Sequence, residues 1–355
     1  MKVFIRSYGC QANIADSEAM AALLKKEGHE LVQSEKEADK ILVNTCSVKN
    51  KTQGKELHYL RKWSAEKEVI VGGCLTKTID IRAFAPNVVA VFDTNSISKV
   101  AEIMESSKDT FSQEKEPNRL DIPVMRIKKT IGIIPLSQGC LNNCTYCATK
   151  HSRGNLLSYR IGDIKRAVEE AVHEGCTKIY LTSQDTGCYG FDIQTTLPEL
   201  LKELIEIPGD FSIRVGMMNP WHVKKILPAL SEVYHSPKIM KFIHMPVQSG
   251  SDRILKHMKR VHTVQEFKDI IKTLRKDHPA IHIATDIIVG YPLETEEDFE
   301  MTLSLIQEIQ PEVLNSSKFS SRPGTAAATE KQLSSEIIDQ RSKRMHPYIR
   351  EIKKL

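Results

Sequence analysis

Three cysteines in one short loop have a spacing that predicts metal chemistry. Cys140, Cys144 and Cys147 are separated by three and then two residues and follow an apolar run, Ile131–Leu136. A structural zinc site needs four tetrahedral ligands, whereas a 4Fe–4S cluster held by only three thiolates has one iron free for another ligand. The spacing of these residues, the loop cysteines, therefore favours such a cluster. The alternative is a zinc site that takes His151 as its fourth ligand.

Three further cysteines, the sheet cysteines, share a position relative to predicted strands. Cys10, Cys46 and Cys74 each follow a short strand candidate. These strands are Lys2–Ser7, Ile41–Asn44 and Val69–Val71. Strands that alternate with helices predict a doubly wound parallel sheet, whose carboxyl ends lie along one edge. The three sulfurs should converge there and could hold a second cluster with one iron unfilled. Taken singly, each of these cysteines could instead be a small buried side chain.

The patterns of strands and helices divide the chain into four predicted parts. Residues 1–106 contain the sheet, and the polar, irregular residues 107–130 are a linker. Residues 131–328 contain six strands with helices between them, which indicates a partial (β/α)₆ barrel. Residues 329–355 form a helical tail. The six strand candidates of the barrel are Ile131–Leu136, Lys178–Thr182, Phe211–Met217, Lys241–Met245, Ile281–Val289 and Val313–Lys318.

Two polar residues precede helical stretches of this barrel. Asp163 precedes Ile164–Ala167, and Thr295 precedes Glu296–Phe299. Side chains of these types accept hydrogen bonds from the free N–H groups of a first helical turn. Both residues are therefore predicted to cap the amino ends of helices.

The overall composition is that of a soluble globular protein. The 355 residues are 41% hydrophobic and 27% charged, which allows about two domains with separate cores. No apolar run approaches the roughly 20 residues that cross a bilayer, and a signal peptide is missing, so we expect a cytoplasmic protein without a membrane partner. Eight cysteines in a reducing compartment favour metal or redox chemistry over disulfides. The net charge of +5 permits a polyanionic partner without requiring one.

Several short motifs accompany the two cysteine sets. They are Tyr8-Gly9-Cys10-Gln11, Asn44-Thr45-Cys46-Ser47, Gly73-Cys74, Gly139–Cys147, Arg153-Gly154, Pro246–Ser251, Thr285–Pro292 and Arg322-Pro323-Gly324-Thr325. Through them the sequence resembles the MiaB/RimO-type radical S-adenosylmethionine (SAM) methylthiotransferase family, from residue 1 to about residue 345. Leu181–Gly190 and Gly216–Pro220 resemble the archaeal and eukaryotic branch that acts on threonylcarbamoyladenosine in tRNA.

The resemblance implies a methylthio group added to C2 of N6-threonylcarbamoyladenosine, beside the tRNA anticodon. It also implies two 4Fe–4S clusters. The cluster on the loop cysteines would bind SAM and pass it one electron, giving a 5′-deoxyadenosyl radical, and the cluster on the sheet cysteines would supply or carry the sulfur. A further SAM would give the methyl group. Radical chemistry fits the task, because an adenine C2–H is neither acidic nor electrophilic, and the protein's part is to position the cofactors and exclude water.

The resemblance further implies residues that bind SAM. Tyr146 would lie near the SAM adenine, and Gln184 and Arg214 would hold polar groups of SAM. Arg214 could instead form a salt bridge across the barrel mouth. Gly290 is a candidate by position, because active-site loops follow the strands of a parallel barrel and glycine lets a ligand approach the backbone closely.

The implied partners are an electron donor and the anticodon loop of a tRNA that carries threonylcarbamoyladenosine. Members of the family normally continue into a small β-rich TRAM domain that contributes to tRNA binding. This sequence ends at Leu355, close to where that domain should begin, so we expect the domain to be absent, either through truncation or because this member lacks it. The basic segments 256–262 and 331–355 are the remaining candidates for phosphate contacts. We expect the protein to be a monomer.

Two other functions remain open. One is a RimO-like enzyme that methylthiolates a side chain of a ribosomal protein, which the branch-specific loops disfavour. The other is a non-catalytic iron–sulfur or zinc protein that binds RNA.

Overall fold

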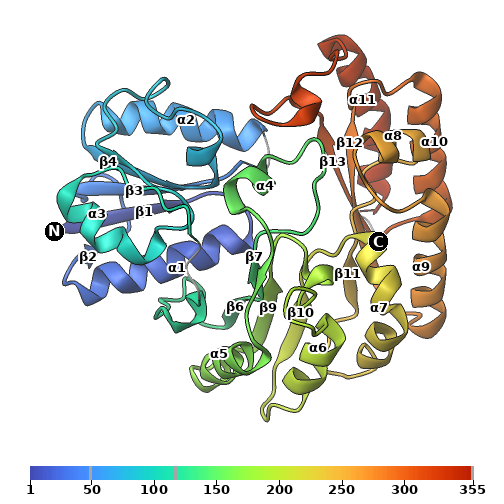
Figure 1. Cartoon of the computed structure of the whole chain (residues 1–355), viewed down its shortest axis with the longest axis horizontal. Coiled ribbons are helices and arrows are strands. Elements are labelled where there is room, and N and C mark those ends of the chain that lie inside the picture. The colour runs from blue at the N-terminus through green and yellow to red at the C-terminus, as the bar shows by residue number, and fades with distance from the viewer. Residues whose placement is uncertain (48–49, 115–117, 353–355) are drawn as a thin grey trace.

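The computed structural model describes residues 1–47, 50–114 and 118–352. Two α/β parts lie side by side, the amino-terminal sheet in blue to cyan and the barrel strands in green to red (Figure 1). The predicted fold class, a doubly wound parallel sheet followed by a partial barrel, is confirmed. No helix in the described part of the chain is both long enough and apolar enough to cross a membrane.

Within the described residues, the amino-terminal sheet has five strands. They are β1 (Lys2–Ser7), β2 (Glu30–Leu31), β3 (Lys40–Thr45), β4 (Glu68–Gly73) and β5 (Ala90–Val91). Their order is β2-β1-β3-β4-β5, and each pairing is parallel. The direction of winding reverses between β1 and β3, and ligands of such sheets bind at the carboxyl ends of the strands that flank this reversal. Two of the sheet cysteines follow these two strands.

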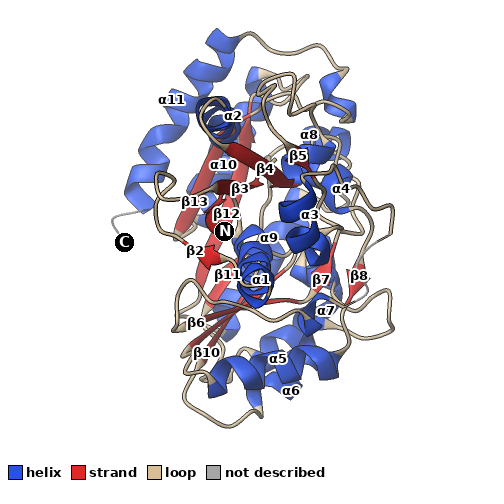
Figure 2. Ribbon diagram, turned by 90° about the vertical axis from the view of Figure 1, so that its left-hand side faces the viewer, coloured by secondary structure: helices blue, strands red, loops and turns tan. Residues whose placement is uncertain are grey.

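Helices cover both faces of this sheet (Figure 2). On one face α2 (Asn50–Ser64) packs its Leu60 against Ile41 and Val43 of β3. On the other face α1 (Gln11–Lys26) and α3 (Val100–Ser106) pack against the alternate residue Leu42. Successive side chains of a strand point to opposite faces, so one apolar strand supplies both cores.

The described residues between 107 and 130 contact the amino-terminal part of the molecule. Thr110 forms a parallel bridge with Phe92, just after β5. The 3₁₀ turn Arg119–Asp121 places the Arg119 guanidinium 2.8 Å from a carboxylate oxygen of Asp16 on α1. Where the linker and the domains begin and end stays a prediction.

The barrel wall contains six parallel strands. They are β6 (Ile131–Pro135), β9 (Lys178–Thr182), β10 (Ser212–Val215), β11 (Phe242–His244), β12 (His282–Val289) and β13 (Val313–Lys318). They form two three-stranded sheets, in the orders β6-β9-β10 and β11-β12-β13. The backbone hydrogen bonds from Ile213 N to Lys238 O (2.7 Å) and from Met218 N to His244 O (2.9 Å) join β10 to the next sheet. No pairing between β6 and β13 occurs among the described residues, so the barrel is open there.

Helices surround the barrel on its outer side (Figure 1). They are α5 (Ile161–His173), α6 (Leu197–Ile205), α7 (Pro220–Val233), α8 (Asp252–His257), α9 (Val264–Asp277), α10 (Glu296–Ile309) and α11 (Ser335–Ile352). The main core lies between these helices and the strands and includes Ile179, Leu181, Ile213 and Val215. Because side chains alternate along a strand, Tyr180 and the other intervening residues face the barrel interior.

The two predicted helix caps had different outcomes. Thr295 caps α10 as predicted, since its side chain accepts a hydrogen bond from Asp298 N in a capping box. The prediction for Asp163 is wrong: α5 begins at Ile161 after Arg160, whose side chain makes no capping hydrogen bond. Asp163 instead lies in the first turn, where a negative charge interacts favourably with the helix dipole.

Candidate active site

Two of the sheet cysteines, Cys10 and Cys74, lie beside one amide on the first turn of α1. Asn13 Oδ1 lies 3.9 Å from Cys10 Sγ and 3.6 Å from Cys74 Sγ. The amide nitrogen of Asn13 donates to the backbone oxygens of Tyr8 and Thr45, at 3.0 and 2.7 Å. This single buried side chain therefore ties together the ends of β1, β3 and β4.

Glycine lets the backbone approach the third sulfur of this set. Gly9 has φ +105°, and a Cβ at this position would lie 2.8 Å from Cys46 Sγ. Any side chain at Gly9 would push against that sulfur in addition to straining the backbone. Packing therefore explains the Gly9-Cys10 motif: the chain after β1 lies close against Cys46, which follows the neighbouring strand β3.

A buried carboxylate and an arginine of the barrel also lie near Cys46. The backbone N–H of Cys46 donates to the two carboxylate oxygens of Glu56, at 3.2 and 3.3 Å. Burial raises the pKa of Glu56 to about 8, opposed by the Cys46 hydrogen bond and by the charge of Arg322. Arg322 follows β13 and donates to Gln53 of α2. The carboxyl-terminal end of the barrel therefore reaches the sheet cysteines.

The loop cysteines lie on a tightly closed loop between β7 (Ser137–Gln138) and α4 (Ala148–Arg153). Gly139 has φ +74°, and a Cβ there would lie 2.0 Å from Asn155 O. Its N–H donates to Gln184 Oε1 at 2.7 Å, and Cys140 N donates to Gly154 O at 3.2 Å. The loop is fixed at both ends, and its three sulfurs belong to partly exposed residues.

The sulfur of Cys140 has several hydrogen-bonding neighbours. The backbone N–H and the side-chain amide of Asn142 donate to it, at 3.4 and 3.1 Å. A hydrogen bond from the buried Cys188 and those from Asn142 lower the pKa of Cys140, although burial opposes the shift. Burial raises the pKa of Cys147 to about 11. The surroundings of the three thiols therefore differ, and only that of Cys140 favours the thiolate.

A buried carboxylate orders the residues behind Cys140. Asp185 Oδ2 lies 2.8 Å from Asn142 Nδ2, 2.7 Å from Asn219 Nδ2 and 2.8 Å from His222 Nδ1. Burial alone would raise the pKa of Asp185, but the hydrogen bond and charge of His222 and the bonds from Asn219 lower it. The carboxylate therefore stays ionised and holds its neighbours in place.

Asp185, Cys188 and His222 form a close group of potential metal ligands, with ligand atoms within 4.8 Å of one another. Both oxygens of Asp185 already accept hydrogen bonds, so this group is better explained as an orienting network than as a metal site. It is the only group of this kind among the described residues. His151, the alternative zinc ligand, is exposed on α4 and is not part of such a group.

A buried arginine connects the loop cysteines to the opposite side of the barrel mouth. Arg260 donates to Tyr146 Oη at 3.1 Å and to Asn219 Oδ1 at 2.8 Å. Its guanidinium lies 4.8 Å from the ring centre of Trp221, and Trp221 also stacks on His262. These residues hold Tyr146 in one orientation next to Cys147.

Comparisons with known proteins agree with this architecture. The radical SAM superfamily matches residues 134–306, and uncharacterized protein family UPF0004 matches residues 2–93. A probable threonylcarbamoyladenosine tRNA methylthiotransferase of Pyrococcus horikoshii is 42% identical over 354 residues, which covers 98% of this chain and 83% of the relative. The chain belongs to the threonylcarbamoyladenosine tRNA methylthiotransferase family.

More distant proteins extend the comparison. The Homo sapiens member of the family is 37% identical over 355 residues, which covers 96% of this chain and 61% of the human protein. Among solved structures, the radical SAM methyltransferase TsrM of Kitasatospora setae has a TM-score of 0.66, with 92% of this chain and 77% of that chain covered. Its sequence is only 13% identical, so this likeness concerns the fold.

The residues predicted to bind SAM differ in their surroundings in the structure. Tyr146 belongs to the cysteine loop and accepts a hydrogen bond from Arg260, whereas Gln184 accepts one from Gly139 N of that loop. Arg214 points into the barrel, 4.5 Å from the ring centre of Phe242 and 5.4 Å from that of Tyr180. Gly290 has φ +77°, and a Cβ there would lie 2.5 Å from Ile338 on α11, so helix packing accounts for this glycine. The roles of these residues toward SAM stay predictions.

Several residues of the site were missed by the sequence analysis. Asn13, Glu56 and His222 lie on helices whose sequence spacing gives no metal or catalytic pattern. Arg260 was predicted only as part of the basic segment 256–262, whereas the structure buries it inside the site. Arg153 did have a sequence signal, because it belongs to one of the motifs shared with the family. The motif did not indicate what role this arginine has. Contacts between distant segments determine these positions, and a single sequence does not specify such contacts.

Proposed function

We propose that this chain is a radical SAM enzyme that adds a methylthio group to C2 of N6-threonylcarbamoyladenosine in tRNA. The observation that carries the proposal is that two separate sets of three cysteines lie at the carboxyl ends of two neighbouring parallel sheets. In Figure 1, α4 lies between these sheets, and it runs from Cys147 to residues that contact Cys74. We infer the substrate from the family to which the chain belongs. The closeness of the two cysteine sets gives a reason why the enzyme would hold two clusters.

The donor atoms of both sets suit iron–sulfur clusters. Each set offers three soft sulfur ligands, and glycine keeps the backbone clear at Gly9 and Gly139. We assign one 4Fe–4S cluster to each set. When bound, the clusters and SAM supply the radical chemistry that replaces hydrogen on an unactivated adenine carbon with a methylthio group.

Residues of this chain would hold SAM and the adenine between the two sets. Buried polar atoms without a hydrogen-bond partner among the described residues include Ser137 Oγ and Gln248 Oε1. Gln248 also has φ +75°, an uncommon conformation for a residue with a side chain. Unpaired buried polar atoms and backbone strain concentrate at functional sites, which supports ligand contacts at these two residues.

Positive charge at the rim of the loop cysteines supports the tRNA assignment. Thr145 bonds to the backbone oxygens of His257 and Met258, so the basic segment 256–262 packs directly on the cysteine loop. Lys256 and Lys259 are exposed there. We assign this rim to phosphate contacts next to the modified base.

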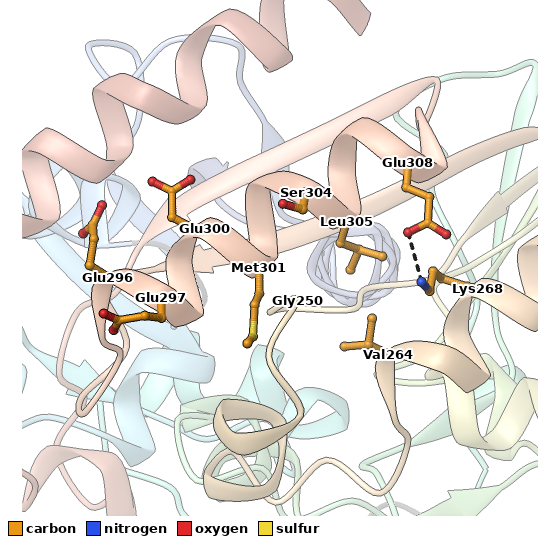
Figure 3. A pocket seen from close by; sticks show the side chains of 10 residues that line it. All are labelled: Gly250, Val264, Lys268, Glu296, Glu297, Glu300, Met301, Ser304, Leu305 and Glu308. Atoms are coloured by element: carbon orange, nitrogen blue, oxygen red, sulfur yellow. Dashed lines mark hydrogen bonds and ion pairs between the residues drawn. The ribbon is translucent and has the colours of Figure 1, made fainter.

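A groove on the outside of the barrel has the opposite charge. It lies between α10 and the start of α9 and is lined by Glu296, Glu297, Glu300 and Glu308 along one helix (Figure 3). Ion pairs offset much of this charge, since Lys268 pairs with Glu308 (2.9 Å) and Arg344 pairs with Glu296 and Glu300. We place the RNA on the cysteine side of the barrel, where the exposed lysines Lys256 and Lys259 lie. We further expect the enzyme to act in the cytoplasm as a monomer, with a separate electron donor.

Nucleoside analysis tests the proposed reaction. The chain would be reconstituted anaerobically with iron and sulfide and incubated with SAM, a reductant and tRNA that carries threonylcarbamoyladenosine. We expect about eight irons per chain, from two 4Fe–4S clusters, and a methylthio-modified nucleoside in the digested tRNA. Full iron loading without this nucleoside would count against the assignment, and a mass gain on a ribosomal protein would favour the RimO-like alternative. Zinc alone, or half the iron, would contradict the two-cluster assignment.

A further inference from the structure

The short helix α4 joins the two cysteine sets through a closed segment. Cys147 precedes α4, and Gly154, which follows it, accepts a hydrogen bond from Cys140 N. Near the carboxyl end of α4, Ser152 Oγ donates to Cys74 O at 2.5 Å, and Ser152 O accepts from Thr94 Oγ1 at 2.9 Å. The segment that carries the loop cysteines is therefore fastened to the backbone of a sheet cysteine.

The guanidinium of Arg153 lies against the sheet cysteines themselves. Its Nε donates to Cys74 Sγ at 3.3 Å, and its Nη2 donates to Asn13 Oδ1 at 2.9 Å. Asn13 Oδ1 is the same atom that lies near Cys10 Sγ and Cys74 Sγ. Arg153, Asn13 and Cys74 are only 5%, 1% and 3% exposed, so water does not weaken these contacts.

A buried ion pair fixes the direction of this guanidinium. Arg153 Nη2 lies 2.5 Å from Asp16 Oδ2, and Arg119 Nη1 lies 2.8 Å from the other oxygen, Asp16 Oδ1. Two arginines thus share one carboxylate, and the guanidinium of Arg153 also donates to the Cys74 sulfur. Arg119 therefore serves as a control for the ion pair with Asp16.

We propose that Arg153 is a positioning residue for the sheet cysteines, which hydrogen-bonds the Cys74 sulfur and so sets the charge environment of the cluster that these cysteines hold. The inference rests on the two-cluster assignment made above. Positive charge and hydrogen bonds at ligand sulfurs stabilise the reduced, more negative state of an iron–sulfur cluster. Removing this donor should therefore shift the reduction potential of the cluster on the sheet cysteines to a more negative value.

The test measures that potential in a chain where only the sheet cysteines can bind a cluster. Cys140, Cys144 and Cys147 are replaced by alanine in the full chain, which is reconstituted and titrated by redox potentiometry with EPR detection. In this background Arg153→Gln removes the positive charge, and Arg153→Lys keeps the charge but removes the planar guanidinium group. Arg119→Lys is the control. We expect a negative shift for Arg153→Gln, a smaller one for Arg153→Lys, and none for Arg119→Lys.

Each other result has a defined meaning. An unchanged potential and EPR spectrum in both Arg153 variants would overturn the inference, as would an equal shift in Arg119→Lys, which would point to the ion pair alone. If Arg153→Gln fails to fold, the comparison of Arg153→Lys with Arg119→Lys still decides. Absence of iron from the sheet cysteines before Arg153 is changed would overturn the two-cluster assignment together with this inference.

Discussion

At the scale of single residues, Asp185 is the group on which most of the loop-cysteine surroundings depend. It is completely buried and accepts hydrogen bonds from three side chains, one in the cysteine loop and two at the start of α7. Replacing Asp185 with Asn removes the charge and turns one accepting atom into a donor that faces other donors. We expect the free energy of unfolding to fall by about 3 kcal/mol, as for other broken buried charge pairs, measured by urea unfolding of the apo chain.

The matched control for this change is Asp163→Asn. Asp163 is a partly exposed acid whose ion pair with Arg166 is long, at 3.7 Å. Surface pairs of this kind contribute at most about 1 kcal/mol. Similar losses for the two variants would contradict the role given to the Asp185 network.

His262 should make the stability of the protein sensitive to acid. Burial lowers its pKa to about 2, and the nearby Arg260 adds to the shift. Below its unfolded pKa of about 6.5 the unfolded chain binds a proton that the folded chain does not, so stability falls by up to about 1.4 kcal/mol per pH unit as pH decreases. Above that pH the contribution is fully present.

The variant His262→Phe tests this, because it keeps an aromatic ring beside Trp221 but cannot bind a proton. We expect the difference in unfolding free energy between pH 7 and pH 5 to be smaller in the variant than in the unchanged chain. Equal pH dependence in the two chains would show that His262 is not held neutral by the fold.

At the scale of elements, the closed loop between β7 and α4 depends on a glycine. In Gly139→Ala the new Cβ would overlap the backbone oxygen of Asn155, and the positive φ would be strained. We expect a loss of at least about 2 kcal/mol in unfolding free energy, together with reduced iron binding by the loop cysteines. Urea unfolding and iron analysis measure the two effects.

Gly162→Ala provides the comparison for Gly139→Ala. Gly162 lies in the first turn of α5, and a Cβ there would meet no atom within 4 Å. Alanine at such a position should cause no loss and could raise stability by up to about 1 kcal/mol. If both alanine variants lost stability equally, the loop geometry would not be the reason.

The secondary-structure elements also show which parts of the fold and the site could be predicted from the sequence. The alternation of apolar strands with helices was enough to place all six cysteines after strands, since parallel strands end at one edge. It could not place Arg322 beside Glu56, or Arg153 beside Cys74, because those contacts join elements far apart in the chain. The start of α5 was missed because Arg160 gives no capping signal.

At the scale of the whole molecule, the distribution of charge predicts where RNA binds. Replacing Lys256 at the cysteine rim with alanine should weaken tRNA binding and reduce the slope of log affinity against log salt by about 1, since one phosphate contact is lost. Lys268→Ala removes the same charge from the acidic groove and should leave the slope unchanged. Titrations at several salt concentrations measure both variants, and equal effects would place the RNA elsewhere.

The division of labour between the two cysteine sets is the central claim, and paired product analysis tests it most directly. The chain with Cys10, Cys46 and Cys74 replaced by alanine is reconstituted and incubated with SAM, reductant and modified tRNA, and both 5′-deoxyadenosine and the methylthio nucleoside are quantified. We predict that SAM cleavage persists while methylthio transfer is abolished, whereas replacing the loop cysteines abolishes both. Loss of SAM cleavage on replacing the sheet cysteines, or methylthio transfer without them, would contradict the account.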